Sequence, residues 1–387
     1  MRTEYELGEL LEYEQPTKYA VESTKYDDKY STPVLTAGKS FILGYTNETN
    51  GIYDNLPVII FDDFTTATQY VNFKFKVKSS AMKILKSDEK LALTKYLYYL
   101  MQTIHCDHDT HKRYWIQTYS KIKVSIPSLA EQQRILDKIE ELFSKLDKGV
   151  EELNKTKEQL KIYRQAVLKE AFEGNFLLPK RIPQYDLLEK FIEKPRYGTS
   201  KKCSYENDNS TPVYRIPNIN IQDNTINQED LKFAKFDESE FESLVLQEGD
   251  VLIIRSNGSV SLVGRAAIIR KQDLSGLFAG YLMRLRICDF SKINPKYLIH
   301  FLNSHEARTY IEQTAKSTSG VNNINSSEIC ALKVPIFTLD EQNAIIREIE
   351  SRLSVCEKVE QTVNESLQKA ESLRQSILKQ AFEGKLV

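Results

Sequence analysis

A segment of 49 residues occurs twice in this chain of 387 residues, at 129–177 and again at 339–387. The two copies align without a gap at an offset of 210 residues and share 17 identities. Both begin with Leu-x-Glu-Gln, and both end in Ala-Phe-Glu-Gly followed by three residues. Chance similarity between two charged helices would not keep register over this length, so we interpret the segment as a duplicated module.

Each copy predicts one long helix with a coiled-coil seam. Apolar residues recur every seven positions with further apolar residues between them, an alternation of threes and fours that is typical of a coiled coil. Neither copy contains a proline before Gly174 or Gly384, where a helix C-terminus favours glycine. The two helices most simply bury their seams against each other. The predicted seam consists of Ile139, Leu146, Leu153, Leu160 and Val167 in the first copy, and of Ile349, Cys356, Val363, Ala370 and Ile377 in the second.

The duplication divides the chain into four parts. Two variable regions, 1–128 and 178–338, are each followed by one of the long helices, 129–177 and 339–387. Both variable regions contain short β-rich runs and helical segments, although their sequences show little similarity to each other. The expected fold class is α+β, with two α/β domains separated by two long antiparallel coiled-coil helices in a pseudo-two-fold repeat. Gly149 is a weak helix former and predicts a local irregularity in the first helix.

Charge and cysteine content exclude several classes of protein. The chain has 53 Lys and Arg against 54 Asp and Glu, and this balance excludes a uniformly basic nucleic-acid coat. The five cysteines are scattered and never spaced as Cys-x-x-Cys, which argues against a disulfide scaffold or a zinc ribbon and favours the cytoplasm. No apolar run approaches the roughly 20 residues of a membrane span, and the charged start predicts no signal peptide.

Two segments resemble parts of catalytic sites. Thr36–Ser40 resembles the end of a phosphate-binding loop, but Pro33 stands where that loop requires glycine. The segment His105–His111 holds three of the five histidines, and its residue types suit zinc, but its spacing fits no compact zinc motif. Nucleotide hydrolysis and metal binding therefore stay minor alternatives. We assign no catalytic residue, since no nucleophile–base pair follows from the spacing.

Each variable region contains one stretch with positive but no negative charge. Between Asp63 and Asp88 there are five lysines, and the alternation in Phe73–Lys78 predicts three of them on one face of a strand. Between Asp250 and Asp273 there are three arginines and a lysine. Lys and Arg neutralise phosphates, whereas Arg, Asn, Ser and Thr can contact base edges. Two such stretches on either side of a long spacer favour a two-headed DNA reader over a merely solvated strand face.

These motifs together resemble the specificity subunit of Type I restriction-modification enzymes, and the resemblance covers essentially the full chain. The resemblance is strongest in the two helical repeats, at Leu129–Ile135 and at the Ala-Phe-Glu-Gly endings that begin at Ala171 and Ala381. The first region is similar to one subtype of target recognition domain through Thr36–Glu48, Val58–Thr66, Phe75–Leu85 and His111–Trp115. The second is similar to another subtype through Tyr214–Ile219, Gly249–Ser259, Leu262–Arg265, Ala279–Arg286 and Pro295–Ser304.

The resemblance implies a DNA-binding subunit that has no catalytic activity and no cofactor of its own. Each recognition domain would read one half of a split double-stranded DNA target, and the helix pair would set the gap. Two methylation subunits carrying S-adenosylmethionine would dock on the chain. Restriction subunits with ATP- and Mg-dependent translocase and nuclease activity would join them, in the cytoplasm and away from any membrane.

The residues expected to contact DNA belong to the two acid-free stretches and their polar neighbours. They are Lys39, Thr65, Thr66, Lys78, Ser79, Ser80, Lys112 and Arg113 in the first region, and Arg255, Ser256, Asn257, Arg265, Asn322 and Asn323 in the second. We expect the lysines mainly to hold phosphates, and Arg255 and Asn257 to read bases.

Three alternatives stay open from the sequence. The chain could serve a system that cuts near its site, or a complex that only methylates. It could also be a coiled-coil linker without a DNA role, which predicts no salt-dependent DNA binding.

Overall fold

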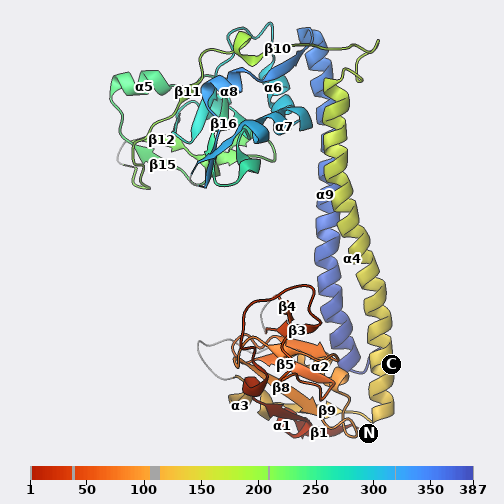
Figure 1. The fold of residues 1–387 in the computed structure, drawn as a ribbon. Helices are drawn as coiled ribbons and strands as arrows, with labels where there is room; N and C mark the ends of the chain where they lie inside the picture. The colour runs from red at the N-terminus through yellow and green to blue at the C-terminus, as the bar shows by residue number, and fades with distance from the viewer. Residues whose placement is uncertain (1, 37–39, 105–113, 208–209, 319, 387) are drawn as a thin grey trace. The chain divides into compact units, whose positions relative to one another are not determined.

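The computed structural model describes residues 2–36, 40–104, 114–207, 210–318 and 320–386. Its contacts divide the chain into two compact units. Unit 1 combines Met1–Asn154 with Asn364–Val387, and unit 2 is the continuous stretch Lys155–Val363. Each unit therefore contains one β-rich domain, called domain 1 or domain 2 below, and parts of both long helices (Figure 1).

The two long helices are α4 (Leu129–Phe172) and α9 (Leu339–Phe382), each of 44 residues. They run antiparallel: Arg374 pairs with Asp147 in unit 1, and Arg164 Nη2 lies 2.9 Å from Glu360 Oε2 in unit 2. This arrangement confirms the predicted fold class of two β-rich domains with two packed long helices. The helix α4 continues through Gly149 without a break, so the predicted irregularity is wrong. A single glycine costs a long helix only about 1 kcal/mol, which its other residues tolerate.

Both long helices end in the same way. Gly174 and Gly384 have φ values of +75° and +74°, which glycine adopts without a steric penalty. Their N–H groups donate to Ala171 and Ala381, and the next residue in each copy donates to the carbonyl five residues earlier. This hydrogen-bond pattern is a Schellman motif, which satisfies the last carbonyls of each helix.

The ten residues predicted for the seam are all buried or partly buried within their units. Ile139 and Ile349 have no exposed surface, and each belongs to the hydrophobic core of a domain. Tyr163 and Leu373, which fall between the heptad positions, are 45% and 50% exposed. The ends of the helices thus contribute to the domain cores as well as to helix pairing.

Domain 1 is built from a two-stranded, a four-stranded and a three-stranded sheet with short helices (Figure 1). The pair β1–β9 is antiparallel and closes the domain next to α4. The strands are β1 (Thr3–Glu6) with β9 (Lys123–Ile126), then β2 (Leu11–Glu14), β8 (Met82–Ser87), β5 (Val58–Asp62) and β6 (Thr68–Val71) in that order, then β4 (Ile42–Thr46), β3 (Thr32–Leu35) and β7 (Lys76–Val77). The helices are α1 (Leu7–Leu10), α2 (Thr94–Met101) and α3 (Tyr114–Gln117).

Domain 2 repeats this plan and adds to it. The corresponding strands are β10 (Gln184–Leu187) with β23 (Lys333–Ile336), then β11 (Arg196–Tyr197), β20 (Leu282–Leu285), β16 (Val251–Ile254) and β18 (Ala266–Ile268), then β15 (Lys232–Ala234), β12 (Thr211–Tyr214) and β19 (Leu277–Phe278). The additions are β13 (Ile219–Asn220) with β14 (Thr225–Ile226), and β17 (Ser256–Asn257), β22 (Val321–Asn323) and β21 (Lys316–Thr318). The helices are α5 (Glu238–Leu244), α6 (Pro295–Leu302), α7 (His305–Thr314) and α8 (Ser326–Cys330).

The shared plan includes strand direction as well as order. Both four-stranded sheets are antiparallel throughout. In both three-stranded sheets the central strand, β3 or β12, pairs antiparallel with one neighbour and parallel with the other. The duplication therefore extends through both domains, although their sequences have diverged too far to align by eye.

The joint between each domain and its long helix is duplicated residue by residue. Gln132 and Gln342 are fully buried. The side-chain oxygen of Gln132 accepts from Leu93 N–H, and that of Gln342 accepts from Asn294 N–H, at 2.9 Å in both cases. Their amide groups each donate to two backbone carbonyls. The glutamine of the Leu-x-Glu-Gln motif thus fixes the start of α2 or α6 against the start of the long helix.

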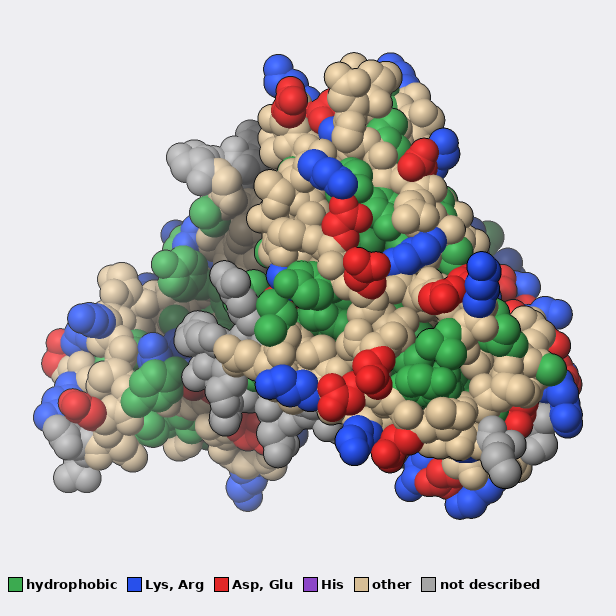
Figure 2. All heavy atoms as spheres, turned by 90° about the horizontal axis from the view of Figure 1, so that it is seen from below, with side chains coloured by type: hydrophobic (Ala, Val, Ile, Leu, Met, Phe, Trp, Pro, Cys, Tyr) green, Lys and Arg blue, Asp and Glu red, His purple; other side chains and the backbone are tan. Residues whose placement is uncertain are grey.

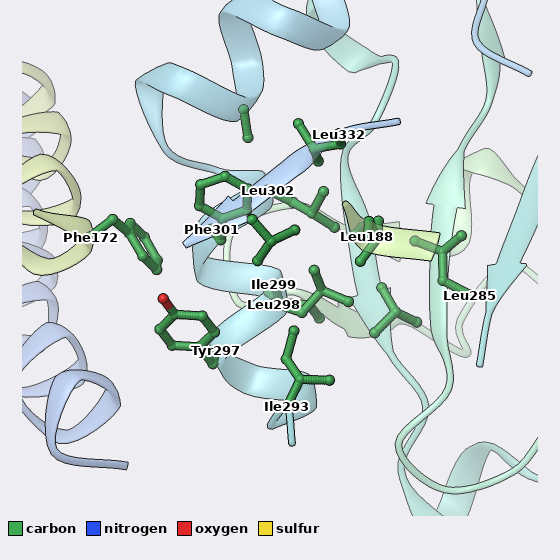
Figure 3. Packing of buried hydrophobic residues seen from close by; sticks show 14 of the residues in the cluster. Phe172, Leu188, Leu285, Ile293, Tyr297, Leu298, Ile299, Phe301, Leu302 and Leu332 are labelled. Carbon is green, nitrogen blue, oxygen red and sulfur yellow. The ribbon is translucent and has the colours of Figure 1, made fainter. Parts of the chain in front are cut away.

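Aromatic contacts close the other side of each joint. In unit 2, Phe172 near the end of α4 packs edge-to-face against Tyr297 and Phe301 of α6 (Figure 3). In unit 1, Phe382 near the end of α9 packs in the same way against Tyr96 of α2. The Ala-Phe-Glu-Gly endings therefore anchor each helix end to a domain.

No helix among the described residues has the length and apolar character that a membrane span requires.

Candidate nucleic-acid interface

The polar residues predicted in domain 1 gather at one end of its four-stranded sheet. Thr65 and Thr66 lie in the turn between β5 and β6, and Ser79 and Ser80 lie just before β8. The two sites are neighbours because Asp62, the last residue of β5, pairs with Met82, the first of β8. We call this surface, with residues 64–66 and 79–80, the strand-end edge of domain 1.

The turn after β5 has a fixed shape. Asp62 Oδ1 accepts hydrogen bonds from the N–H groups of Phe64 at 2.8 Å and Thr65 at 3.3 Å. Thr66 has φ +58° and donates its N–H to the Asp62 carbonyl. An aspartate that bonds the backbone two residues on is a common way to hold such a turn. The turn therefore presents Phe64, Thr65 and Thr66 in a defined order.

A polar network that extends from the exposed Gln15 to the buried pair Lys83 and Asp63 holds the other part of this edge. Gln15 Nε2 donates to the Ser80 carbonyl at 2.6 Å, and Gln15 Oε1 accepts from Lys83 Nζ at 2.5 Å. Lys83 Nζ lies 3.6 Å from Asp63 Oδ2, and Asp63 Oδ1 accepts from Trp115 N–H. Lys83 and Asp63 are 6% and 4% exposed, so their charges compensate each other inside the domain.

The predicted lysine face in Phe73–Lys78 is wrong. Lys76 is only 3% exposed, and its Nζ lies 2.8 Å from Glu48 Oε2 and donates to the Asn50 carbonyl. This contact lowers the pKa of Glu48. The alternation failed because β7 contains only Lys76 and Val77, and both are buried. Lys78 is exposed at the end of this strand and stays available for a phosphate.

Part of the predicted set lies outside the described residues. These are Lys39, Lys112 and Arg113, together with the histidine-rich segment 105–111 and most of the segment that resembles a phosphate-binding loop. Among the described residues, no group of three or more His, Cys, Asp or Glu side chains could hold a metal ion.

In domain 2 the predicted residues meet at the corresponding edge. Arg255 follows β16 directly, and Ser256 and Asn257 form β17. These two pair with Asn323 and Asn322 of β22, and Asn322 Nδ2 donates to the Gly258 carbonyl at 2.9 Å. We call this surface, with residues 255–257, 281 and 321–323, the strand-end edge of domain 2. Five of the six residues predicted in this domain are thus brought together.

Arg255 is held in a defined orientation. Its guanidinium carbon lies 4.4 Å from the centre of the Tyr197 ring, and its Nη1 donates to the Gly280 carbonyl at 3.2 Å. The Tyr197 hydroxyl accepts from Ser326 N–H at 2.8 Å, which fixes the ring beneath the arginine. Sequence reasoning missed Tyr197, because its distance in sequence from Arg255 gives no signal of the contact.

Two of the residues predicted to contact DNA in domain 2 make contacts within the domain. Arg265 Nη1 donates to Asn303 Oδ1 at 2.8 Å and its Nε to the Ser261 carbonyl, and burial lowers the pKa of Arg265. The side chain thus joins the start of β18 to the end of α6. Ser256 is 6% exposed within the β17–β22 ladder. These placements argue against DNA contact by either side chain.

The surface charge is mixed. On the face shown in Figure 2, Lys and Arg side chains lie among Asp and Glu side chains, and hydrophobic groups form small separate patches. This agrees with the net charge of −1. Affinity for an anionic partner must therefore come from local groups such as those at the strand-end edges.

Comparison with known proteins places these features in a family context. Residues 3–161 match the family model described as "Type I restriction modification DNA specificity domain". The chain is 37% identical to the EcoR124I/EcoR124II specificity subunit of Escherichia coli, over 88% of this chain and 84% of that protein. It is 31% identical to the EcoKI specificity subunit of E. coli K12, over 70% of this chain and 59% of that protein.

Solved structures share the fold at low sequence identity. A chain from a study of complex assembly and conformational transition in the type I R-M system has a TM-score of 0.73 at 17% identity, covering 100% of this chain and 98% of that one. The HsdS subunit from Thermoanaerobacter tengcongensis has a TM-score of 0.52 at 17% identity, covering 100% and 97%.

Proposed function

The chain belongs to the family of Type I restriction-modification specificity subunits, which supply DNA target recognition within their complexes and are not themselves catalytic; from this we propose that each of its two domains reads one half of a split double-stranded DNA target. Domain 1 would read one half through its strand-end edge and domain 2 the other half. Subunits of this family carry no cofactor of their own. The cofactors of the complex belong to the partner subunits.

One observation supports this proposal above the others. Two domains that share the order of their four-stranded and three-stranded sheets present different polar side chains at the same end of the four-stranded sheet. Domain 1 presents Thr65, Thr66, Ser79 and Ser80, whereas domain 2 presents Arg255, Asn257 and Asn322. Hydroxyl, amide and guanidinium groups read different base edges, so two unlike half-sites would follow.

The gap between the half-sites would be set by α4 and α9. A helix of 44 residues extends over about 66 Å at 1.5 Å per residue. A helix pair changes its length only by insertion or deletion of whole residues, so the gap would be constant for this chain. The seam residues would maintain this spacing by keeping the two helices paired.

Partners follow from the duplication. The chain assembles with other subunits of a Type I complex. Its two matching domain–helix joints would provide two equivalent docking sites for one kind of subunit. We assign these docking sites to two methylation subunits that carry S-adenosylmethionine. Restriction subunits with ATP- and Mg-dependent translocase and nuclease activity would join this core, in the cytoplasm where the DNA lies.

Methylation mapping tests the proposal directly. The chain would be co-expressed with its methylation subunit, and modified bases would be mapped over the host genome. We expect one split motif with a fixed gap. A motif with a single half would refute the role of one domain, and absence of any modification from a stable complex would refute DNA reading.

The variant Arg255→Ala sharpens the test. Loss of a base-contacting arginine costs roughly 1–3 kcal/mol of discrimination, so one position of one half-site should become degenerate. The other half-site should stay unchanged. Arg347→Ala is the control, because this exposed arginine lies in α9, outside the strand-end edge of domain 2. An unaltered motif in Arg255→Ala would remove Arg255 from the base-reading set.

A further inference from the structure

We propose that Phe64 and Tyr281 enter the base stack of the bound DNA, one aromatic side chain in each half-site. The inference rests on the proposed function, since it names how each strand-end edge engages the duplex. Both side chains are large and mostly exposed, 57% for Phe64 and 63% for Tyr281. Neither was predicted from the sequence as a contact residue.

The two aromatic residues occupy the same end of corresponding sheets. Phe64 lies two residues beyond β5, and Tyr281 directly precedes β20, the strand that pairs with β16. Asp62 pairs with Met82 in domain 1, and Ile254 pairs with Leu282 in domain 2. Each is the last residue pair between the two strands at this end of its sheet. A single exposed aromatic is common on protein surfaces. Its recurrence at this end in two domains of shared topology calls for a shared role.

Both aromatic residues are carried on backbone that is held in place. Phe64 N–H donates to Asp62 Oδ1 at 2.8 Å within the turn after β5. In domain 2, the Tyr281 carbonyl accepts from Arg255 N–H at 2.9 Å, and the preceding Gly280 carbonyl accepts from Arg255 Nη1. Arg255 thus positions the turn that carries Tyr281. A wedge must be rigid, because a mobile side chain would lose its entropy on insertion.

The neighbouring side chains favour nucleic acid over a protein partner. Phe64 is followed by Thr65 and Thr66, and Tyr281 lies beside Arg255, which precedes Asn257. Proteins that insert a side chain between the base steps of a duplex combine an apolar wedge such as Phe with neighbouring polar side chains that contact the DNA. Phe64 has no polar group, so its contact with DNA must be apolar, and its ring is flat and large enough to stack on a base. A protein interface would require a wider apolar patch.

Insertion of a ring unstacks one base step, and the cost depends on the step. Pyrimidine–purine steps such as TA and CA open most easily. Each half-site should therefore contain such a step at the position that the aromatic residue reaches. Local unstacking would also lower the cost for a methylating partner to extrude its target base.

The test uses DNA that carries the split motif found by methylation mapping, with 2-aminopurine placed at successive positions. This base fluoresces more strongly when it is unstacked. The full chain in complex with its methylation subunits should raise the fluorescence at one position in each half-site other than the target base that the partner extrudes. Phe64→Ala should abolish the rise in one half-site only, and Tyr281→Ala in the other. Each substitution should weaken binding by up to about ten-fold, because loss of the stacking contact is partly offset by the unstacking cost that is avoided.

Two further variants separate stacking from other effects. Tyr281→Phe keeps the ring and should keep the fluorescence rise, whereas loss of the rise would assign the effect to the hydroxyl and overturn the proposal. Tyr205→Ala removes an equally exposed ring, 66%, remote in sequence from the strand-end residues, and should change nothing. A split motif that is methylated normally while both alanine variants leave the fluorescence unchanged would overturn the wedge alone. Absence of a split motif would refute the proposed function itself.

Discussion

Asp63 in domain 1 and Arg255 in domain 2 both follow the central strand of a four-stranded sheet, and they have opposite charges. Asp63 is buried and paired with Lys83. Arg255 is half-buried, stacked on Tyr197 and hydrogen-bonded to the Gly280 carbonyl in the turn before β20. The strand order and directions around them are the same. One backbone plan therefore supports two chemically unlike strand-end edges.

The joints between domains and helices show the reverse pattern. Gln132 and Gln342 make matching sets of hydrogen bonds, and Lys95–Glu140 is matched by Lys296–Glu350. Divergence is therefore concentrated at the strand ends, whereas the contacts that attach each domain to its helix are retained. This division allows specificity to change without loss of the scaffold.

The largest expected effect comes from breaking the buried pair in domain 1. Asp63→Ala leaves the Lys83 charge buried without its partner, and such changes cost about 3–5 kcal/mol. The double variant Asp63→Leu with Lys83→Met should cost much less, because it removes both charges. Urea unfolding of the purified chain measures both. Equal costs for the single and double variants would show that the pair does not compensate.

The duplicated glutamines should give two matching losses. Gln132→Leu or Gln342→Leu leaves one backbone N–H and two carbonyls without their partner. Each unsatisfied group costs about 1 kcal/mol or more, so each variant should lose about 3 kcal/mol of stability. Chemical denaturation with a probe in each unit would measure the losses. Losses that differ by more than about two-fold would break the equivalence of the two joints.

A pH effect should distinguish unit 2 from unit 1. Burial lowers the pKa of His300 on α6 from 6.5 to about 4. Two smaller electrostatic effects oppose each other, since Glu350 raises this pKa and Lys296 lowers it. The unfolded chain therefore binds the proton more readily, and stability falls as the pH drops from about 6.5 towards 4. The loss at pH 5 should be about 2 kcal/mol.

His300→Gln should remove this loss, measured by urea unfolding at pH 7 and pH 5. His305→Gln, at an exposed position, serves as the control. Domain 1 has Tyr99 at the matching place on α2, so its unfolding should lack this component. A His300→Gln variant with the same pH profile as the wild type would contradict the assignment.

The smallest expected effect is a gain. Gly149 is an exposed residue within α4, and a Cβ atom there would meet nothing within 4 Å. Gly149→Ala should stabilise the chain by about 1 kcal/mol, because alanine favours the helix. Gly320→Ala is the contrasting control: its surroundings are also open, but its φ of +80° strains alanine. Thermal unfolding should move in opposite directions for the two variants.

Sequence patterns were sufficient for the helices and insufficient for the strand-end edges. The heptad period and the glycine endings predicted α4 and α9, because helical order depends on neighbours a few residues apart. The lysine alternation in Phe73–Lys78 misled, because burial of Lys76 depends on Glu48, which lies far away in sequence. The contact of Arg265 with Asn303 could not be predicted for the same reason, since Asn303 belongs to another element. The shared strand order of the two domains was not predicted, because strands that pair in a sheet can lie far apart in the sequence.

The composition of the two units has a consequence for how the chain folds during synthesis. Unit 2 is one continuous stretch, but the core of unit 1 includes Ile377, Leu378 and Ala381 of α9. Contacts between distant parts of a chain form late, because the intervening segment must first be ordered or looped out. Domain 1 leaves the ribosome before domain 2, yet it lacks part of its core until α9 emerges. Domain 2 can therefore complete its folding before domain 1, although domain 1 is synthesised earlier.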